Sequence, residues 1–288
     1  MSNVTGLPPW VVLDPIIQSW LIEDIGRGDR TTQGLMAGKA SIVKAELVAK
    51  ASGIVGGLPL ASRVFQLLDA NAGFIAIAQE GQWCKAGEQI AKIEGTLDGL
   101  LTGERVALNL VMRLSGISTL TYEYVKQIAD LEARLVDTRK TTPGLRVLEK
   151  YASQLGGAIN HRMGLDDAVM IKDNHIAAVG GIGEAIARIR SNMPYPLTIE
   201  VETENLEQVE EALQHGADII MLDNMPPEMT KLAVRKIRDR DRRIKIEASG
   251  NITLDNIRAV AQTGVNYIST SAPITQSKWL DLSMRIFR

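Results

Sequence analysis

Cysteine, aromatic residues and an excess of charge of either sign are all scarce in this 288-residue chain. The one cysteine, Cys84, excludes an intrachain disulfide and a metal–thiolate cluster. Aromatic residues make up 4% of the sequence and the formal net charge is −2. Surfaces that bind nucleic acid are usually basic and interleaved with aromatic side chains, so we expect no nucleic-acid partner.

Long hydrophobic runs are also missing. The best candidate, residues 106–114, contains Arg113 and is too short to span a membrane. The first ten residues lack the basic segment and apolar stretch of a signal peptide. Together with the single cysteine, these absences predict a soluble, cytoplasmic protein with no membrane partner.

Basic side chains are instead concentrated in two short blocks that contain glycine. The blocks are DTRKTTPG at 137–144 and GGAINHRMGLDDAVMIKDNH at 156–175. Any single lysine or glutamate in a loop is most often a solvated surface charge. Cations gathered in this way in a near-neutral chain predict a pocket for a small, highly charged anion that carries phosphate and carboxylate groups.

From about residue 131, short β-branched runs alternate with amphipathic helical patterns. The expected strands are 133–138, 168–172, 197–202, 218–223, 244–249 and 265–270, with a seventh at 156–161. The expected helices are 144–154, 183–191, 205–215, 228–238 and 253–262. Such alternation predicts parallel strands covered by helices, here an open, incomplete α/β barrel.

The first 115 residues have a different texture. We expect a helix around 14–23, a strand at 43–49 and a compact, turn-rich β module at 81–95. The stretch 103–129 is predicted to form two helices that meet near Ser115 and Gly116. The segment 279–287 alternates like an antiparallel strand and is expected to return to this first domain.

Polar residues follow the predicted strands at their C-terminal ends. They are Arg139, Lys140, Lys172, Glu202, Asp223, Ser249, Gly250, Thr270 and Ser271. In parallel α/β barrels this rim carries the active site, and the loops after the late strands commonly hold phosphate. The small residues at 249–251 and 270–271 let backbone N–H groups approach a phosphate monoester. The two lysines could hold further phosphate as compact point charges.

Glu202 and Asp223 could share a divalent cation. Oxygen ligands without a paired histidine or cysteine favour Mg²⁺ or Mn²⁺ over zinc. The alternative is that these carboxylates form structural ion pairs with Lys140 and Lys172. Arg139 and Arg162 offer planar forks that match carboxylates. Neither His161 nor His175 has a hydroxyl or thiol nucleophile at an obvious spacing, so a hydrolase triad lacks support.

Several longer runs resemble those of the quinolinate phosphoribosyltransferase family. They are EDIGRGDRTT at 23–32, GERVALN and RLSGIST within 103–119, the two basic blocks, IEVE, MLDNM, EASGNITLDNI and GVNYIS. The similarity covers essentially the whole chain. It implies transfer of the phosphoribosyl group of phosphoribosyl pyrophosphate to quinolinate with decarboxylation, giving nicotinate mononucleotide, pyrophosphate and CO₂ for NAD biosynthesis, with Mg²⁺.

The resemblance also implies an α/β fold in two domains. An N-terminal α/β sandwich at 1–115 is rejoined by 275–288, and a seven-stranded open barrel spans 116–274. The family forms a homodimer in which one subunit's N-terminal domain closes the other's barrel mouth, and assembly beyond a dimer stays open.

Carried over by motif, Arg139, His161 and Arg162 grip the quinolinate carboxylates, and Arg105 reaches in from the partner subunit. Lys140 and Lys172 contact the phosphoribosyl substrate and its pyrophosphate, while Glu202 and Asp223 hold the ribose hydroxyls or the metal. The residues implied to cradle the 5′-phosphate are Ser249, Gly250, Thr270 and Ser271. The sequence departs from the family pattern at Asn251 and Ser271, where glycine is common.

Three alternatives remain at this point. A related pyrophosphorylase-like phosphoribosyltransferase could use a different acceptor, although Arg105, Arg139 and Arg162 together favour a dicarboxylate. A barrel lyase could form a Schiff base on Lys172, with Arg162 and Lys140 lowering the pKa of that lysine. A non-catalytic protein could bind the anion without turnover.

Overall fold

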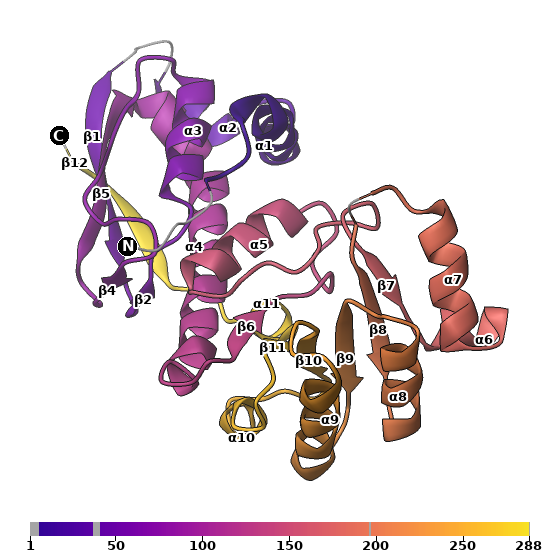
Figure 1. Ribbon diagram of the computed structural model, residues 1–288. Coiled ribbons are helices and arrows are strands. Elements are labelled where there is room, and N and C mark those ends of the chain that lie inside the picture. The colour runs from indigo at the N-terminus through magenta and orange to yellow at the C-terminus, as the bar shows by residue number, and fades with distance from the viewer. Residues whose placement is uncertain (1–5, 37–40, 196, 288) are drawn as a thin grey trace. The chain divides into compact units, whose positions relative to one another are not determined.

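The computed structural model describes residues 6–36, 41–195 and 197–287 (Figure 1). The chain forms two compact units. The first comprises residues 1–122, 147–157 and 276–288, and the second comprises 123–146 and 158–275. The first unit is therefore assembled from three separate stretches, one of which, 147–157, has the sequence pattern of a barrel helix.

The first unit is built on a four-stranded antiparallel sheet in the order β12-β1-β5-β3. These strands are β1 (Ile42–Ala49), β3 (Gly73–Ala76), β5 (Gln89–Thr96) and β12 (Leu282–Phe287). A separate antiparallel pair joins β2 (Gly53–Ile54) to β4 (Trp83–Cys84). The pairing of β1 with β12 runs from Lys44 opposite Phe287 to Ala49 opposite Leu282, so the last strand of the chain forms an edge of this sheet.

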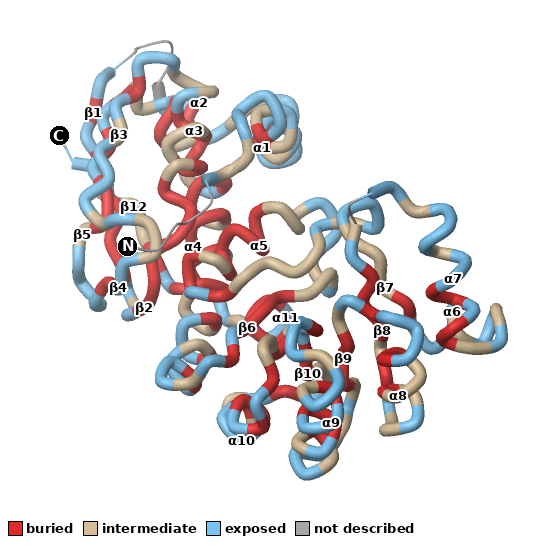
Figure 2. Tube along the Cα trace, in the orientation of Figure 1, coloured by how far each residue is buried: buried red, intermediate tan, exposed pale blue. Residues whose placement is uncertain are grey.

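Helices lie on one side of this sheet (Figure 1). The helices with residues in this unit are α1 (Trp10–Ile25), α2 (Arg30–Met36), α3 (Leu58–Leu68), α4 (Leu97–Gln127) and α5 (Arg146–Leu155). Leu13, Ile17 and Leu21 recur at every fourth position of α1 and are buried, which gives this helix one buried stripe. Most of the rest of α1 is exposed (Figure 2). The helix expected at 14–23 is therefore present and extends beyond both predicted ends.

A single helix, α4, runs through the region where the sequence predicted two, so that prediction is wrong. The helix continues through Gly116. The missing side chain at this position makes room for another segment of the chain to pack against α4. A Cβ atom there would collide with the backbone carbonyl of Lys278. The segment before β12 approaches α4 at this point, and the N–H of Leu280 donates to the carbonyl of Met112 at 3.0 Å. Ser115 accepts the N–H of Gly56 at 2.9 Å.

The second unit is a six-stranded parallel sheet in the order β6-β11-β10-β9-β8-β7. Its strands are β6 (Arg134–Val136), β7 (Val169–Ile171), β8 (Ile199–Thr203), β9 (Ile219–Asp223), β10 (Lys245–Ser249) and β11 (Tyr267–Ser269). The predicted seventh strand at 156–161 is reduced to one parallel bridge between Ile159 and Val136. Strand pairing stops there because the carboxylate of Asp137 accepts hydrogen bonds from the backbone N–H of His161 and the side-chain amide of Asn160.

An outer layer of helices follows the order of the strands (Figure 1). The helices of this unit are α6 (Asp173–Val179), α7 (Ile182–Asn192), α8 (Leu206–Gln214), α9 (Pro227–Arg240), α10 (Ile257–Ala261) and α11 (Ala272–Thr275). Along each strand, side chains alternate between the helices and the interior of the sheet. Val201, Ile220, Ile246 and Ile268 are fully buried members of this strand core. Within the described ranges, no helix is long and apolar enough to cross a membrane.

Candidate active site

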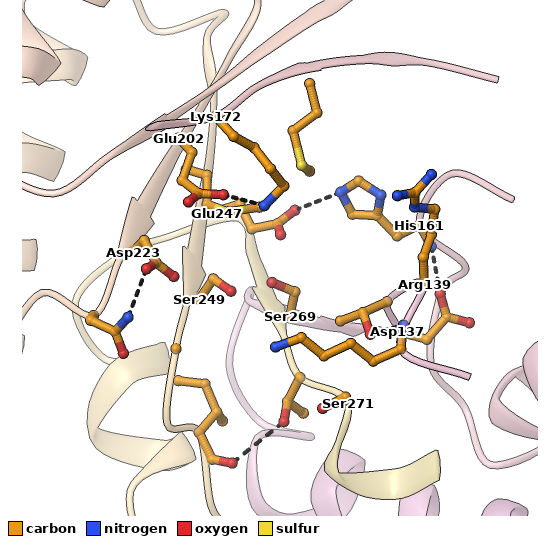
Figure 3. Close-up of a pocket in the computed structure, with 18 of the residues that line it drawn as sticks. Asp137, Arg139, His161, Lys172, Glu202, Asp223, Glu247, Ser249, Ser269 and Ser271 are labelled. Carbon is orange, nitrogen blue, oxygen red and sulfur yellow. Dashed lines mark hydrogen bonds and ion pairs between the residues drawn. The ribbon is translucent and has the colours of Figure 1, made fainter. Parts of the chain in front are cut away.

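A cavity of about 510 Å³ lies at the C-terminal ends of the parallel strands (Figure 3). Every residue that the sequence singled out in the second unit lines it. They are Arg139, Lys140, His161, Arg162, Lys172, Glu202, Asp223, Ser249, Gly250, Thr270 and Ser271. Arg105 is the one predicted site residue elsewhere, since it lies exposed on α4 in the first unit.

Strand register brings these residues together. Asp223 at the end of β9 lies opposite Ser249 at the end of β10, which in turn lies opposite Ser269 at the end of β11. Because parallel strands end at the same edge, the loops that follow them converge on one place. Residues far apart in the sequence therefore share one cavity.

Guanidinium groups form one side of the cavity. Arg139 and Arg162 are both half-buried, and Nη1 of Arg162 donates to the carbonyl of Ala168 at 2.8 Å. Loss of solvent around Arg162, together with the nearby positive charge of Arg139, lowers the pKa of the Arg162 guanidinium. Two neighbouring cations of this kind favour a bound anion, because its negative charge relieves their mutual repulsion.

Two carboxylates face the same space from neighbouring strands. Glu202 lies 2.5 Å from Nζ of Lys172, so the alternative of an ion pair holds for these two residues. Asp223 accepts the side-chain N–H of Asn224 at 2.6 Å. Both residues line the cavity, and a pair of hard oxygen donors suits Mg²⁺. The donor set therefore fits the predicted metal.

The loop after β10 is locked to the loop after β9. Asn224 donates its backbone N–H to the carbonyl of Ser249 at 2.9 Å, and the side chain of Asn251 donates to that of Asn224 at 2.9 Å. Gly250 has φ of +93°, while Asn224 and Asn251 have φ of +52° and +51°. Asparagine adopts this left-handed region more readily than most residues, so Asn251 is compatible with this backbone conformation.

Three buried acids lie in or next to the cavity wall: Asp137 and Glu247 line the cavity, and Glu200 faces His161, which also lines it. Asp137, Glu200 and Glu247 are each 3% exposed. Asp137 accepts from the N–H of His161 at 2.8 Å and from Nδ2 of Asn160 at 2.6 Å. Sequence reasoning quoted Asp137 in the first basic block without giving it a role.

Sequence reasoning also gave no role to Glu200 or Glu247. Both face a ring nitrogen of His161: Nε2 lies 3.1 Å from Glu200 Oε2 and 3.6 Å from Glu247 Oε2. Burial and the charge of Glu200 raise the pKa of Glu247 to about 7. The available signal was spacing, because Glu200 precedes Glu202 by two residues and Glu247 precedes Ser249 by two. Residues two apart on a strand face the same side.

The fold and the cavity together define a parallel α/β enzyme that binds an anionic substrate at the C-terminal ends of its strands. The cations and the loop of small residues suit a ligand with both phosphate and carboxylate groups, and two carboxylates line the same cavity.

Comparisons with known proteins identify the family. Models of the N-terminal and C-terminal domains of quinolinate phosphoribosyl transferase match residues 29–115 and 117–285. The chain is 60% identical over 287 residues to a Synechocystis protein named probable nicotinate-nucleotide pyrophosphorylase (carboxylating), covering 100% of this chain and 97% of that protein. It is 36% identical over 271 residues to the Mycobacterium leprae nicotinate-nucleotide pyrophosphorylase (carboxylating), covering 93% and 95%.

A solved structure agrees. The nicotinate-nucleotide pyrophosphorylase of Francisella tularensis is 35% identical, with a TM-score of 0.92 and 100% of both chains covered. The chain therefore belongs to the quinolinate phosphoribosyltransferase family. The resemblance found in the sequence is confirmed.

Proposed function

We propose that this protein transfers the phosphoribosyl group of phosphoribosyl pyrophosphate to quinolinate with loss of CO₂, a step of NAD biosynthesis. Membership of the family and the names of its relatives support this function. The structural observation that carries it is the single cavity that collects guanidinium groups, lysines, two carboxylates and a loop of small residues. Each group matches a part of the two substrates.

The cavity residues divide the substrates between them. Arg139 and Arg162 bind the two carboxylates of quinolinate, because a guanidinium fork pairs with a carboxylate in two parallel hydrogen bonds. Lys140 and Lys172 bind the pyrophosphate. The 5′-phosphate lies against the loops of Ser249, Gly250, Thr270 and Ser271. His161 lies at the edge of the base-binding side.

The reaction needs positioning and charge more than a strong base. The ring nitrogen of quinolinate forms a bond to C1 of the ribose while the bond from C1 to pyrophosphate breaks. Glu202 and Asp223 stabilise the positive charge that develops on the ribose and bind its hydroxyls. Mg²⁺, held by Glu202 and Asp223, would supply charge neutralisation for the departing pyrophosphate.

Decarboxylation follows from the charge of the new pyridinium ring. The bond between C2 and its carboxylate breaks, CO₂ leaves, and the electron pair stays on C2 next to the positively charged nitrogen. A proton then binds C2 to give nicotinate mononucleotide. The cavity holds the ring in place during this step, and no nucleophilic residue is required.

The lyase alternative fits the site less well. A Schiff base requires a lysine amine that is free to attack a carbonyl group. Nζ of Lys172 instead lies 2.5 Å from a carboxylate oxygen of Glu202. The ion pair favours a role for Lys172 in binding the charge of a phosphorylated substrate.

We also propose a cytoplasmic homodimer in which Arg105 completes the quinolinate site of the partner subunit. The exposed position of Arg105 on α4 supports this proposal, because the remaining predicted residues gather in one cavity of the second unit. A third cation would add positive charge around the two carboxylates that Arg139 and Arg162 bind.

Product analysis tests the proposed function. Purified protein receives phosphoribosyl pyrophosphate, Mg²⁺ and either quinolinate or nicotinate, and the mononucleotide and CO₂ are measured. We expect both products from quinolinate and none from nicotinate. Lys172→Ala should abolish turnover. Lys231→Ala should leave turnover unchanged, because Lys231 is a partly exposed lysine of α9 that is paired with Glu228 and does not line the cavity. Turnover of nicotinate, or none of either base by folded protein, would favour the relative with a different acceptor.

A further inference from the structure

Two buried carboxyl groups beside His161 have no place in the proposed reaction. Glu200 on β8 and Glu247 on β10 are each 3% exposed. The Oε1 atom of each is fully buried and, among the described residues, has no hydrogen-bond partner. Their other oxygens converge on Nε2 of His161, a residue of the base-binding side. Buried polar groups of this kind are costly unless they serve a role.

The hydrogen bonds of His161 determine where its ring proton lies. Nδ1 accepts the backbone N–H of Arg162 at 2.8 Å, so Nδ1 carries no proton. The proton of the neutral ring must then be on Nε2, which lies 3.1 Å from Glu200 Oε2. Glu200 is therefore the acceptor that selects this tautomer, and Glu247 lies farther away at 3.6 Å.

The same argument decides against a metal at this place. The ligand atoms of His161, Glu200 and Glu247 all lie within 4.8 Å of one another, a spacing that could hold an ion. A metal on Nε2 would need the lone pair of that nitrogen and would move the proton to Nδ1. Nδ1 already accepts a backbone N–H, so the cluster fits a hydrogen-bonded assembly rather than a metal site.

The ring of His161 in turn holds the chain that presents Arg162. The carboxylate of Asp137 accepts the backbone N–H of His161 at 2.8 Å, which holds the chain on the near side of the ring. On the other side the ring nitrogen accepts the N–H of Arg162, and Nη1 of Arg162 donates to Ala168 at 2.8 Å. A rotation of the ring would release the backbone of Arg162.

Glu200 also acts on Arg162 through charge. Burial of the Arg162 guanidinium and the positive charge of Arg139 both disfavour its charged form, and the negative charge of Glu200 opposes them. A guanidinium that binds a substrate carboxylate must keep its charge and its orientation. Glu200 supports both.

We propose that Glu200 is a positioning residue for recognition of the pyridine dicarboxylate, acting through His161 on Arg162. This inference rests on the proposed function of the cavity. It does not place Glu200 in contact with the substrate.

The test compares Glu200→Ala and Glu200→Gln in the full-length protein, alone and combined with His161→Ala. We expect Glu200→Ala to raise the KM for quinolinate at least about tenfold, since a hydrogen bond to a charged group typically contributes more than that factor. The KM for phosphoribosyl pyrophosphate should stay within about twofold. Glu200→Gln should recover part of the loss, because its amide oxygen still accepts from Nε2 while its charge is gone.

The combined variants show whether Glu200 acts through His161. In the His161→Ala background we expect the effect of Glu200→Ala to shrink to less than about threefold, because residues that act as a unit are not additive. Glu80→Gln controls for general loss of stability, because Glu80 is a half-buried acid of the first unit that accepts the backbone N–H groups of Gly57 and Leu58, and it should leave both KM values unchanged. Equal loss for both substrates, or an undiminished effect without His161, would overturn the proposal.

A measurement that does not need turnover separates this proposal from the function itself. Nitrogen-15 NMR of the His161 ring, assigned with His161→Ala, should show the Nε2-protonated tautomer in the wild type and a mixture of tautomers in Glu200→Ala. A proton on Nδ1 in the wild type would refute the assignment of Glu200. Wild-type protein with the expected tautomer and no quinolinate turnover would instead reject the proposed function.

Discussion

The side chain of Glu247 lies on the inner side of β10, and its carboxyl group is close to that of Glu200. Burial and that neighbouring charge raise the pKa of Glu247 to about 7, from 4.5 in an unfolded chain. The folded state therefore binds the Glu247 proton more tightly than the unfolded state. The protonated carboxyl group of Glu247 therefore stabilises the folded state. This contribution is fully present below about pH 4.5 and is lost as the pH rises through about 7.

We predict that Glu247→Gln weakens the pH dependence of stability. Wild-type protein should lose stability between pH 5 and pH 8, at up to about 1.4 kcal/mol for each unit of pKa shift, and the variant should lose less. The midpoints of urea unfolding of the wild type and the variant, each recorded at pH 5 and at pH 8, measure this loss of stability.

Glu210→Gln is the control for this prediction. A hydrogen bond from Lys236 lowers the pKa of Glu210, so that group titrates below the tested range. Identical pH dependence in wild type and Glu247→Gln would show that Glu247 ionises as freely in the folded state as in the unfolded one.

Single residues at strand ends could be predicted from the sequence because polar groups stood where apolar runs stopped. The buried acids could not be recognised in the same way, since Glu200 and Glu247 sit inside those runs. Only the two-residue period of a strand connects Glu200 to Glu202, and that period also fits a solvent-facing side. The helices cover one side of the sheet, and the other side faces the cavity. The strand sequence alone does not show which side the helices cover.

The loop after β10 contains a glycine, Gly250, whose backbone conformation and surroundings both disfavour a side chain. Gly250 has φ of +93°, and a Cβ atom there would collide with the side chain and the backbone nitrogen of Asn224. The loops after β9 and β10 would have to separate to make room. Both loops line the cavity on the side proposed for phosphate.

We predict that Gly250→Ala weakens binding of phosphoribosyl pyrophosphate at least about tenfold, because backbone strain of this kind costs about 1–3 kcal/mol and the loop would shift. Calorimetric titration measures the Kd. Gly180→Ala is the matched control: its φ is +96°, but a Cβ atom there meets nothing within 4 Å. A normal Kd for Gly250→Ala would remove this loop from the phosphate site.

At the level of elements, the strands of the parallel sheet followed the sequence pattern and α4 did not. Gly116 was read as the junction of two helices, since isolated glycine weakens a helix. In the structure it admits the backbone of Lys278, which lies far along the chain. A local pattern contains no information about a partner at that separation.

The place of residues 147–157 in the first unit could not be predicted for a similar reason. Helix α5 has the amphipathic pattern of a barrel helix, yet residues 147–157 belong to the first unit. Within that unit, Tyr151 donates to Glu80 at 2.5 Å and Glu149 lies 2.7 Å from Arg113. The periodicity of a helix shows which of its sides is buried, but not the core against which that side packs.

Mixing two inactive variants tests the assembly of the whole molecule. Arg105→Ala and Lys172→Ala should each be inactive, and their mixture should recover about a quarter of wild-type activity, because half of randomly paired dimers contain one intact site of two. Lys172→Ala mixed with Arg139→Ala is the control, since both residues line the same cavity of one chain and no intact site can form. Failure to recover activity, with subunit exchange shown by mass spectrometry, would contradict a shared site.

The pairing of β12 with β1 has a consequence for biosynthesis. During translation, β1 leaves the ribosome more than two hundred residues before its edge partner. Until then the outer edge of β1 presents unpaired N–H and carbonyl groups, which invite contact with other nascent chains. The sheet of the first unit can be completed only after β12 has been synthesised, so a ribosome that stalls before β12 would leave a chain prone to aggregation, even though most of its other elements had already been made.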